Sequence, residues 1–218
     1  MNSSGRTRSS PTLLEPGYQD KGSSCATKPQ VGIFGTASEI APYSEGFKYA
    51  TANDGTTAVA WSADGLIRVA TRSSGGQFGA PESLSPPDDY AYSFAVSVAP
   101  DGTTTVAWMR VLPGETPYDA AHFLIEVATR EPGGSFGLPI VEADLAERPH
   151  DLAMTAGTDG STTIVWSSDT TMRALTRPKG GSFGQPQDIS AQGEGVTIRT
   201  INHVDQADAD DAPHVITA

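Results

Sequence analysis

Three segments of the 218-residue chain repeat one another, and this repetition limits the fold more than any other feature. They begin NDGTTAVAW, PDGTTTVAW and TDGSTTIVW, and each continues to a Thr-Arg pair and then to Gly-Gly-x-Phe-Gly. The tryptophans Trp61, Trp108 and Trp166 are 47 and 58 residues apart, as are the Asp-Gly pairs, whereas the Gly-Gly pairs are 58 and 47 apart. A 47-residue unit is therefore repeated, with 58 − 47 = 11 extra residues in the second copy. Such a period indicates a repeat architecture.

Each unit is predicted to form four strands. The first strand covers residues 47–53, 94–100 and 152–158, and ends at Asp-Gly, which favours a type I′ hairpin. The second strand is rich in β-branched residues and ends at the tryptophan. The third ends in Thr-Arg and carries on one face the pairs Ile67/Val69, Ile125/Val127 and Met172/Ala174. The fourth is entered by a proline, as suits an edge strand: Pro81, Pro139 and Pro186.

The pentapeptide GGSFG, at residues 133–137 and 180–184, also fits the G-x-S-x-G pattern of a serine hydrolase. That motif requires a helix after the serine, but strand pattern and a proline follow here. In the first unit the position of Ser135 and Ser182 is taken by Gln77. We therefore interpret the pentapeptide as a turn with a phenylalanine anchor.

Four-stranded units of this length, each with a tryptophan, resemble the blades of bacterial β-propellers, including the sialidase-like and WD40-like families. The resemblance covers residues 31–218 and implies an all-β propeller of about four four-stranded antiparallel blades. The units lie near residues 41–85, 86–145 and 146–190, and residues 31–40 and 191–218 would form a shared or partial blade. The ring is either closed with four blades or incomplete.

The net charge and the distribution of apolar residues limit the kinds of partner that the chain can have. The net charge is −12, and because residues 1–30 carry +2, the remainder carries −14. Because residues 31–218 are strongly acidic, they repel the phosphate backbone, which disfavours nucleic acid as a partner. No apolar run is long enough to span a membrane, and residues 1–30, which hold the single cysteine, Cys25, show no signal peptide and are expected to be a disordered tail. The resemblance implies an extracellular or cell-surface location.

The sequence offers little catalytic chemistry. Its four histidines lack metal-binding spacing, and the acidic run DQADADD at residues 205–211 lacks the glycine of a calcium loop, so neither a metal nor another cofactor is expected. Sialidases bind carboxylated sugars with three arginines. The repeated Arg72, Arg130 and Arg177 take equivalent positions in every unit, and we expect them to pair with neighbouring carboxylates as structural residues.

The segments that depart from the repeat are better candidates for a site. In a propeller, the loop between strands two and three and the link between blades open on one face. Residues 111–122 lie in that loop of the second unit, and residues 86–92 and 147–151 lie in the links on either side. The candidate binding residues gathered there are Asp88, Tyr90, Tyr92, Tyr118, Asp119, His122, Arg148 and His150. Aromatic rings combined with acids suit sugars or peptides.

The sequence therefore predicts a non-catalytic binding module whose ligand is a carbohydrate or a peptide. One alternative is a sialidase-like glycoside hydrolase, or a degenerate relic of one, that would use Asp88, Asp119 or Asp151. Another is a truncated piece of a larger secreted propeller without a function of its own. An incomplete ring would leave sheet edges that favour oligomers.

Overall fold

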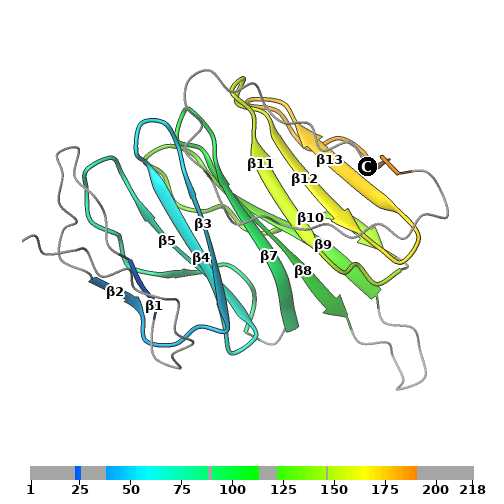
Figure 1. Cartoon of the computed structure of the whole chain (residues 1–218), viewed down its shortest axis with the longest axis horizontal. Helices are drawn as coiled ribbons and strands as arrows, with labels where there is room; N and C mark the ends of the chain where they lie inside the picture. The colour runs from blue at the N-terminus through cyan, green and yellow to red at the C-terminus, as the bar shows by residue number, and fades with distance from the viewer. Residues whose placement is uncertain (1–22, 26–37, 88–89, 113–121, 146, 191–218) are drawn as a thin grey trace, which may run out of the picture.

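The computed structural model describes residues 23–25, 38–87, 90–112, 122–145 and 147–190. Within this part of the chain all regular structure is β-strand. Three antiparallel sheets of four strands each follow one another along the chain and lie side by side (Figure 1). The prediction of an all-β protein built from four-stranded antiparallel units is confirmed.

Each sheet is a meander in which the strands pair in chain order. The first sheet contains β3 (Gly46–Thr51), β4 (Thr57–Ala63), β5 (Leu66–Arg72) and β6 (Glu82–Ser83). The second contains β7 (Tyr90–Val98), β8 (Thr104–Leu112), β9 (His122–Arg130) and β10 (Ile140–Leu145). The third contains β11 (Leu152–Ala156), β12 (Thr162–Ser167), β13 (Met172–Arg177) and β14 (Gln187–Asp188). Two further strands, β1 (Ser23–Cys25) and β2 (Ser38–Ala41), pair with each other.

The first strand of each later sheet packs on the sheet before it, since β7 contacts β3, β4 and β5, and β11 contacts β7 and β8. The three tryptophans stand at equivalent positions on their sheets and are all buried. Trp108 lies in the core between the first and second sheets, and Trp166 in the core between the second and third. Trp61 faces away from the second sheet and is covered by Ile40 and Ala41 of β2. The repeat therefore places its largest side chain at the same point of every sheet.

The turn after each first strand differs from the type I′ turn predicted for Asp-Gly. In the second sheet, Gly102 donates its N–H to the carbonyl of Ala99 (2.8 Å), and of the Asp-Gly pair only Gly102 has a positive φ, of 88°. Asp101 Oδ1 accepts the N–H of Thr103 at 3.0 Å. This is a longer loop with one left-handed glycine, closed by an aspartate side chain. The other two sheets repeat this arrangement.

A two-residue hairpin with two positive φ angles does occur elsewhere, between β4 and β5. Asp64 and Gly65 have φ of 55° and 72°, and they directly join the paired residues Ala63 and Leu66. The number of residues between the paired ends, and not the dipeptide itself, selects the turn type.

The Gly-Gly-x-Phe-Gly segments form turns, as the sequence predicts. The first glycine of each segment has a positive φ (68°, 72° and 66°). The second glycine donates its N–H to the backbone carbonyl of the residue three positions earlier in the chain. A strand, and not a helix, follows each segment. The phenylalanines pack into the core on the tryptophan-bearing side of their own sheets. Ser135 and Ser182 therefore lie in the connection that follows a turn and precedes a strand.

The repeated arginines bind differently from the prediction. Arg177 Nη1 donates to Thr129 Oγ1 and Nη2 to Thr105 Oγ1, both at 3.0 Å, and its guanidinium lies over Phe183. Arg72 Nη2 donates to Thr57 Oγ1 at 3.1 Å. These hydrogen bonds of the two arginines therefore go to threonine hydroxyls of their own and the neighbouring sheet and not to the predicted carboxylates, although the charge of Arg177 also acts on Glu142, where it opposes the rise in pKa caused by burial.

Residues 1–30 were expected to be a disordered tail, but Ser23–Cys25 within them form strand β1. Residues 191–218, including the acidic run at 205–211, lie outside the described residues. Within the described residues the structure contains no helix long and apolar enough to cross a membrane.

Candidate functional site

A β-bulge at Ser93 in β7 creates the starting point of the candidate site. Tyr92 pairs with Met109 and Phe94 pairs with the adjacent residue of β8, Trp108. Strand β7 therefore contains one extra residue, Ser93, that has no partner on β8. Ser93 has a φ of 37°, which side-chain-bearing residues rarely adopt. The bulge turns Phe94 toward the first sheet and Tyr92 toward the third, where it packs against the core around Trp166. Bulges of this kind re-aim side chains and occur next to functional sites.

Tyr90 and Tyr92 form an aromatic pair on the side of β7 that the bulge turns toward the third sheet. Their ring centroids are 6.2 Å apart and their planes differ by 27°. Tyr92 is half-buried, whereas Tyr90 is 67% exposed. Both residues belong to strand β7, although the sequence predicted them in a link between sheets. The exposed ring of Tyr90 is therefore held on a strand and supported by a second ring.

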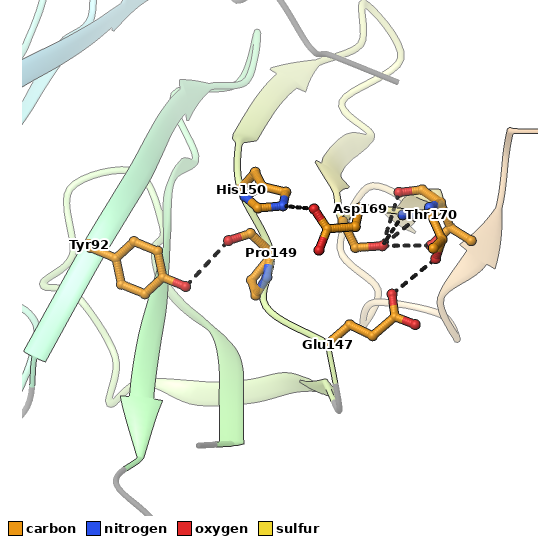
Figure 2. Close-up of polar contacts among 8 residues, drawn as sticks. Tyr92, Glu147, Pro149, His150, Asp169 and Thr170 are labelled. Carbon is orange, nitrogen blue, oxygen red and sulfur yellow. Dashed lines mark hydrogen bonds and ion pairs between the residues drawn. The ribbon is translucent and has the colours of Figure 1, made fainter. Parts of the chain in front are cut away.

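The link between β10 and β11, residues 147–151, lies beside this pair. The Tyr92 hydroxyl donates to the carbonyl of Pro149 at 3.4 Å (Figure 2). His150 donates its N–H to the carbonyl of Ser167 at 2.9 Å, and Ser167 donates in return to the carbonyl of Asp151 at 3.2 Å. These hydrogen bonds hold residues 147–151, which connect the second sheet to the third, in a defined position.

Two side-chain pairs join the link to the loop between β12 and β13 (Figure 2). His150 Nε2 lies 2.7 Å from Asp169 Oδ1, and both side chains are exposed. Thr170 Oγ1 donates to Glu147 Oε2 at 3.1 Å. The link supplies an imidazole and a carboxylate to these pairs, and the loop between β12 and β13 supplies the second carboxylate and the hydroxyl.

Arg148 is exposed and supplies a positive charge next to the aromatic pair. Burial raises the pKa of the Tyr92 hydroxyl above its usual value, while the charge of Arg148 and its hydrogen bond with Tyr92 oppose this rise. The Tyr92 hydroxyl is therefore neutral near pH 7 and serves as a hydrogen-bond donor.

Of the eight predicted binding residues, the structure places Tyr90, Tyr92 and Arg148 close together, and His150 lies in the same link as Arg148 with its imidazole directed at Asp169 (Figure 2). His122 opens β9 at the same end of the second sheet but is paired with Asp144 of β10, at 3.6 Å. Asp88, Tyr118 and Asp119 lie outside the described residues. Glu147, Asp169 and Thr170 were not among the predicted residues. The hairpin loop that supplies Asp169 and Thr170 is short and carries no sequence signal of its own.

The arrangement is suited to binding. The exposed ring of Tyr90 stacks on Tyr92, whose hydroxyl interacts with Arg148, and the link that carries Arg148 also carries the His150–Asp169 and Glu147–Thr170 pairs. Rings of this kind stack on the apolar faces of sugars, and the charged groups hydrogen-bond to hydroxyls. Within the described part of the chain, no group of three or more His, Cys, Asp or Glu residues is placed to hold a metal ion.

No protein family model matches the chain, and no curated protein matches it. Among solved structures, it is similar to a protein of unknown function from Bacteroides caccae, with 12% sequence identity and a TM-score of 0.29. That match covers 72% of this chain and 65% of the other, less than two thirds of its length.

Proposed function

We propose that the protein is a non-catalytic carbohydrate-binding module, and that its three sheets are consecutive blades of a β-propeller. The order of the sheets and the contacts between their first strands support the propeller arrangement. In such an arrangement, the candidate site lies where the second blade is linked to the third.

The exposed ring of Tyr90 is the observation that carries the proposal. A tyrosine that is 67% exposed, and that stacks on Tyr92 above a β-bulge, is positioned by the backbone and not by burial. Tyr92 supports the ring of Tyr90 on one side, and the exposed remainder of that ring is the surface that we assign to a ligand. The flat apolar face of a sugar ring matches this surface, and Arg148, which interacts with the supporting Tyr92, is the charged group assigned to the sugar hydroxyls.

An array that carries both glycans and peptides tests this proposal. We expect the parent chain to bind a subset of glycans, and the Tyr90→Ala variant to lose that binding. Tyr43→Ala, which removes an exposed tyrosine outside the site, serves as the matched control. Binding to peptides alone, or glycan binding that is unchanged in Tyr90→Ala, would overturn the assignment.

The hydrolase alternative requires two carboxylates about 5–10 Å apart in a pocket. Of the three aspartates named for it, Asp151 is within the described residues, and its backbone carbonyl is used in the bond to Ser167. Release of reducing sugar from any glycan bound on the array would favour this alternative.

A further inference from the structure

The two interfaces between sheets inside the chain follow one rule. In each, the tryptophan-bearing face of the later sheet packs on the aliphatic face of the earlier one. Phe94, Val96 and Trp108 of the second sheet share a core with Ala60 and Ile67 of the first. The core between the second and third sheets is built in the same way. Among the described residues, the stack of three four-stranded sheets therefore ends in a tryptophan-bearing face on the first sheet, partly covered by β2, and an aliphatic face on the third.

The second interface also contains a specific polar contact. Thr105 of β8 and Thr129 of β9 are cross-strand partners on the aliphatic face of the second sheet. Arg177 of the third sheet donates to both hydroxyls, each at 3.0 Å. This contact joins one sheet to the next through a guanidinium and a threonine pair.

The outer face of the third sheet, defined by Thr163, Val165, Ala174 and Thr176, repeats the threonine half of this contact. Thr163 and Thr176 are cross-strand partners that correspond to Thr105 and Thr129, and their hydroxyls lie 3.0 Å apart at the surface. Val165 and Ala174 are paired next to them and are half-buried. The described residues place no further sheet on this face.

The opposite end of the stack, the aromatic face of the first sheet, repeats the arginine half. It comprises Phe47, Tyr49, Arg72 and Phe78. Phe47 and Tyr49 are 55% and 51% exposed, whereas their counterparts in the second sheet, Phe94 and Val96, are 8% and 7% exposed. The strand β2 covers the neighbouring Trp61 and leaves these two rings exposed.

Arg72 on this face occupies the position that Arg177 has in the third sheet. Its guanidinium lies 5.5 Å from the centre of the Phe78 ring and donates to Thr57, just as Arg177 lies over Phe183 and donates to Thr162. Arg177 also donates hydrogen bonds to two threonines of the preceding sheet. Among the described residues, Arg72 makes no hydrogen bond of this kind to another sheet.

We propose that the outer face of the third sheet binds the aromatic face of the first sheet of a second copy of this chain. In this head-to-tail contact, Arg72 of one copy meets the Thr163–Thr176 pair of the other, and Phe47 and Tyr49 lie against Val165 and Ala174. The partner is a second copy because the two faces are the two halves of an interface that the chain already contains. A contact between two different faces is of the heterologous kind, which joins copies in one direction.

The test measures the mass of the full chain in solution by analytical ultracentrifugation. We expect the parent to form dimers or larger multiples. Thr176→Arg, which places a second guanidinium opposite Arg72, and Tyr49→Lys, which removes a ring from the opposite face, are each expected to weaken self-association at least about tenfold. Leu138→Lys changes a leucine that is 89% exposed and outside both faces, and it should associate like the parent.

Mixing the two variants distinguishes this contact from a general loss of folding. Each variant retains one intact face, so the mixture of Thr176→Arg and Tyr49→Lys should form a dimer and nothing larger. Failure of the mixture to associate would overturn the proposal, as would a monomeric parent, in which the rest of the chain covers both faces. Equal weakening by Leu138→Lys would also overturn it.

Discussion

Tyr92 and Phe94 face opposite sides of the second sheet although one residue separates them. Phe94 joins the core beside Trp108, and Tyr92 packs on the side of Trp166, because the bulge at Ser93 shifts the strand register by one residue. In a regular strand the two side chains would share one face. The candidate site therefore depends on a local irregularity in the backbone.

The bulge predicts the response of Ser93 to substitution. Because Ser93 has a positive φ, Ser93→Val should destabilise the protein by about 1–2 kcal/mol, whereas Ser93→Gly should leave its stability close to that of the parent. Urea denaturation followed by tryptophan fluorescence measures both. A valine variant as stable as the parent would show that Ser93 is not held in this conformation.

The glycine of the repeated Asp-Gly loop should be sensitive in the same way. Gly102 has a φ of 88°, so Gly102→Ala is expected to cost about 1–2 kcal/mol of unfolding free energy even though an added Cβ would meet only ordinary contacts with Pro132. Gly46→Ala is the matched control, since a Cβ there would meet nothing within 4 Å and its φ is not positive. Equal effects of the two substitutions would contradict the assigned turn.

Glu126 should be the most sensitive charged residue of the second sheet. It is buried, accepts the indole N–H of Trp108 at 2.9 Å, and is paired with Arg110 at 2.8 Å. Glu126→Ala removes both acceptors inside the core and should cost about 3–5 kcal/mol. Glu126→Gln retains an acceptor for Trp108 and should cost less. If the alanine variant unfolds at the same urea concentration as the parent, the buried pair does not exist in solution.

The burial of the Tyr92 hydroxyl predicts that the protein loses stability at alkaline pH. Burial raises its pKa in the folded state, so its contribution is fully present below the unfolded-state pKa of about 10 and is lost as the pH rises through the folded-state pKa. Tyr92→Phe should weaken this alkaline dependence. Unfolding free energy measured across the alkaline range compares the variant with the parent, and equal slopes for the two proteins would contradict the burial of Tyr92.

The hydrogen-bonded Asp101 carboxylate predicts that the protein loses stability at acid pH. Its pKa is lowered mainly by the hydrogen bond from the backbone of Thr103, so its contribution is present above the unfolded-state pKa of about 4 and is lost as the pH falls through the folded-state pKa. Asp101→Asn retains an acceptor oxygen and should remove part of this acid dependence at a small cost in stability. If this variant follows the acid unfolding curve of the parent, Asp101 does not close the loop.

The repeated landmarks made the sheets predictable from the sequence. The tryptophans, the Asp-Gly pairs and the Gly-Gly turns recur together, and the structure places each at the same point of its sheet. The loop type after Asp101 was not predictable from the dipeptide, because it depends on how far the strand pairing extends toward the turn. The threonine partners of Arg177 were missed because they lie on a neighbouring sheet, 48 and 72 residues away in sequence.

The candidate site could be predicted only in part. The loss of the repeat pattern around Tyr90 and Arg148 pointed to the region where the structure places Tyr90, Tyr92 and Arg148 close together, since scaffold residues recur and these do not. The bulge at Ser93 leaves no sequence signature, because serine is common in regular strands and turns alike. The partners Asp169 and Thr170 come from a hairpin whose position beside residues 147–151 depends on the packing of the second sheet on the third.

The most direct test of the account is a titration of the parent chain and of Tyr90→Ala with the glycan that the array identifies. If Tyr90 forms the binding surface, the variant should bind at least about tenfold more weakly, equivalent to about 1.4 kcal/mol, while Tyr43→Ala binds like the parent. Equal affinities of Tyr90→Ala and the parent would contradict the claim that the bulge in β7 builds a ligand-binding site.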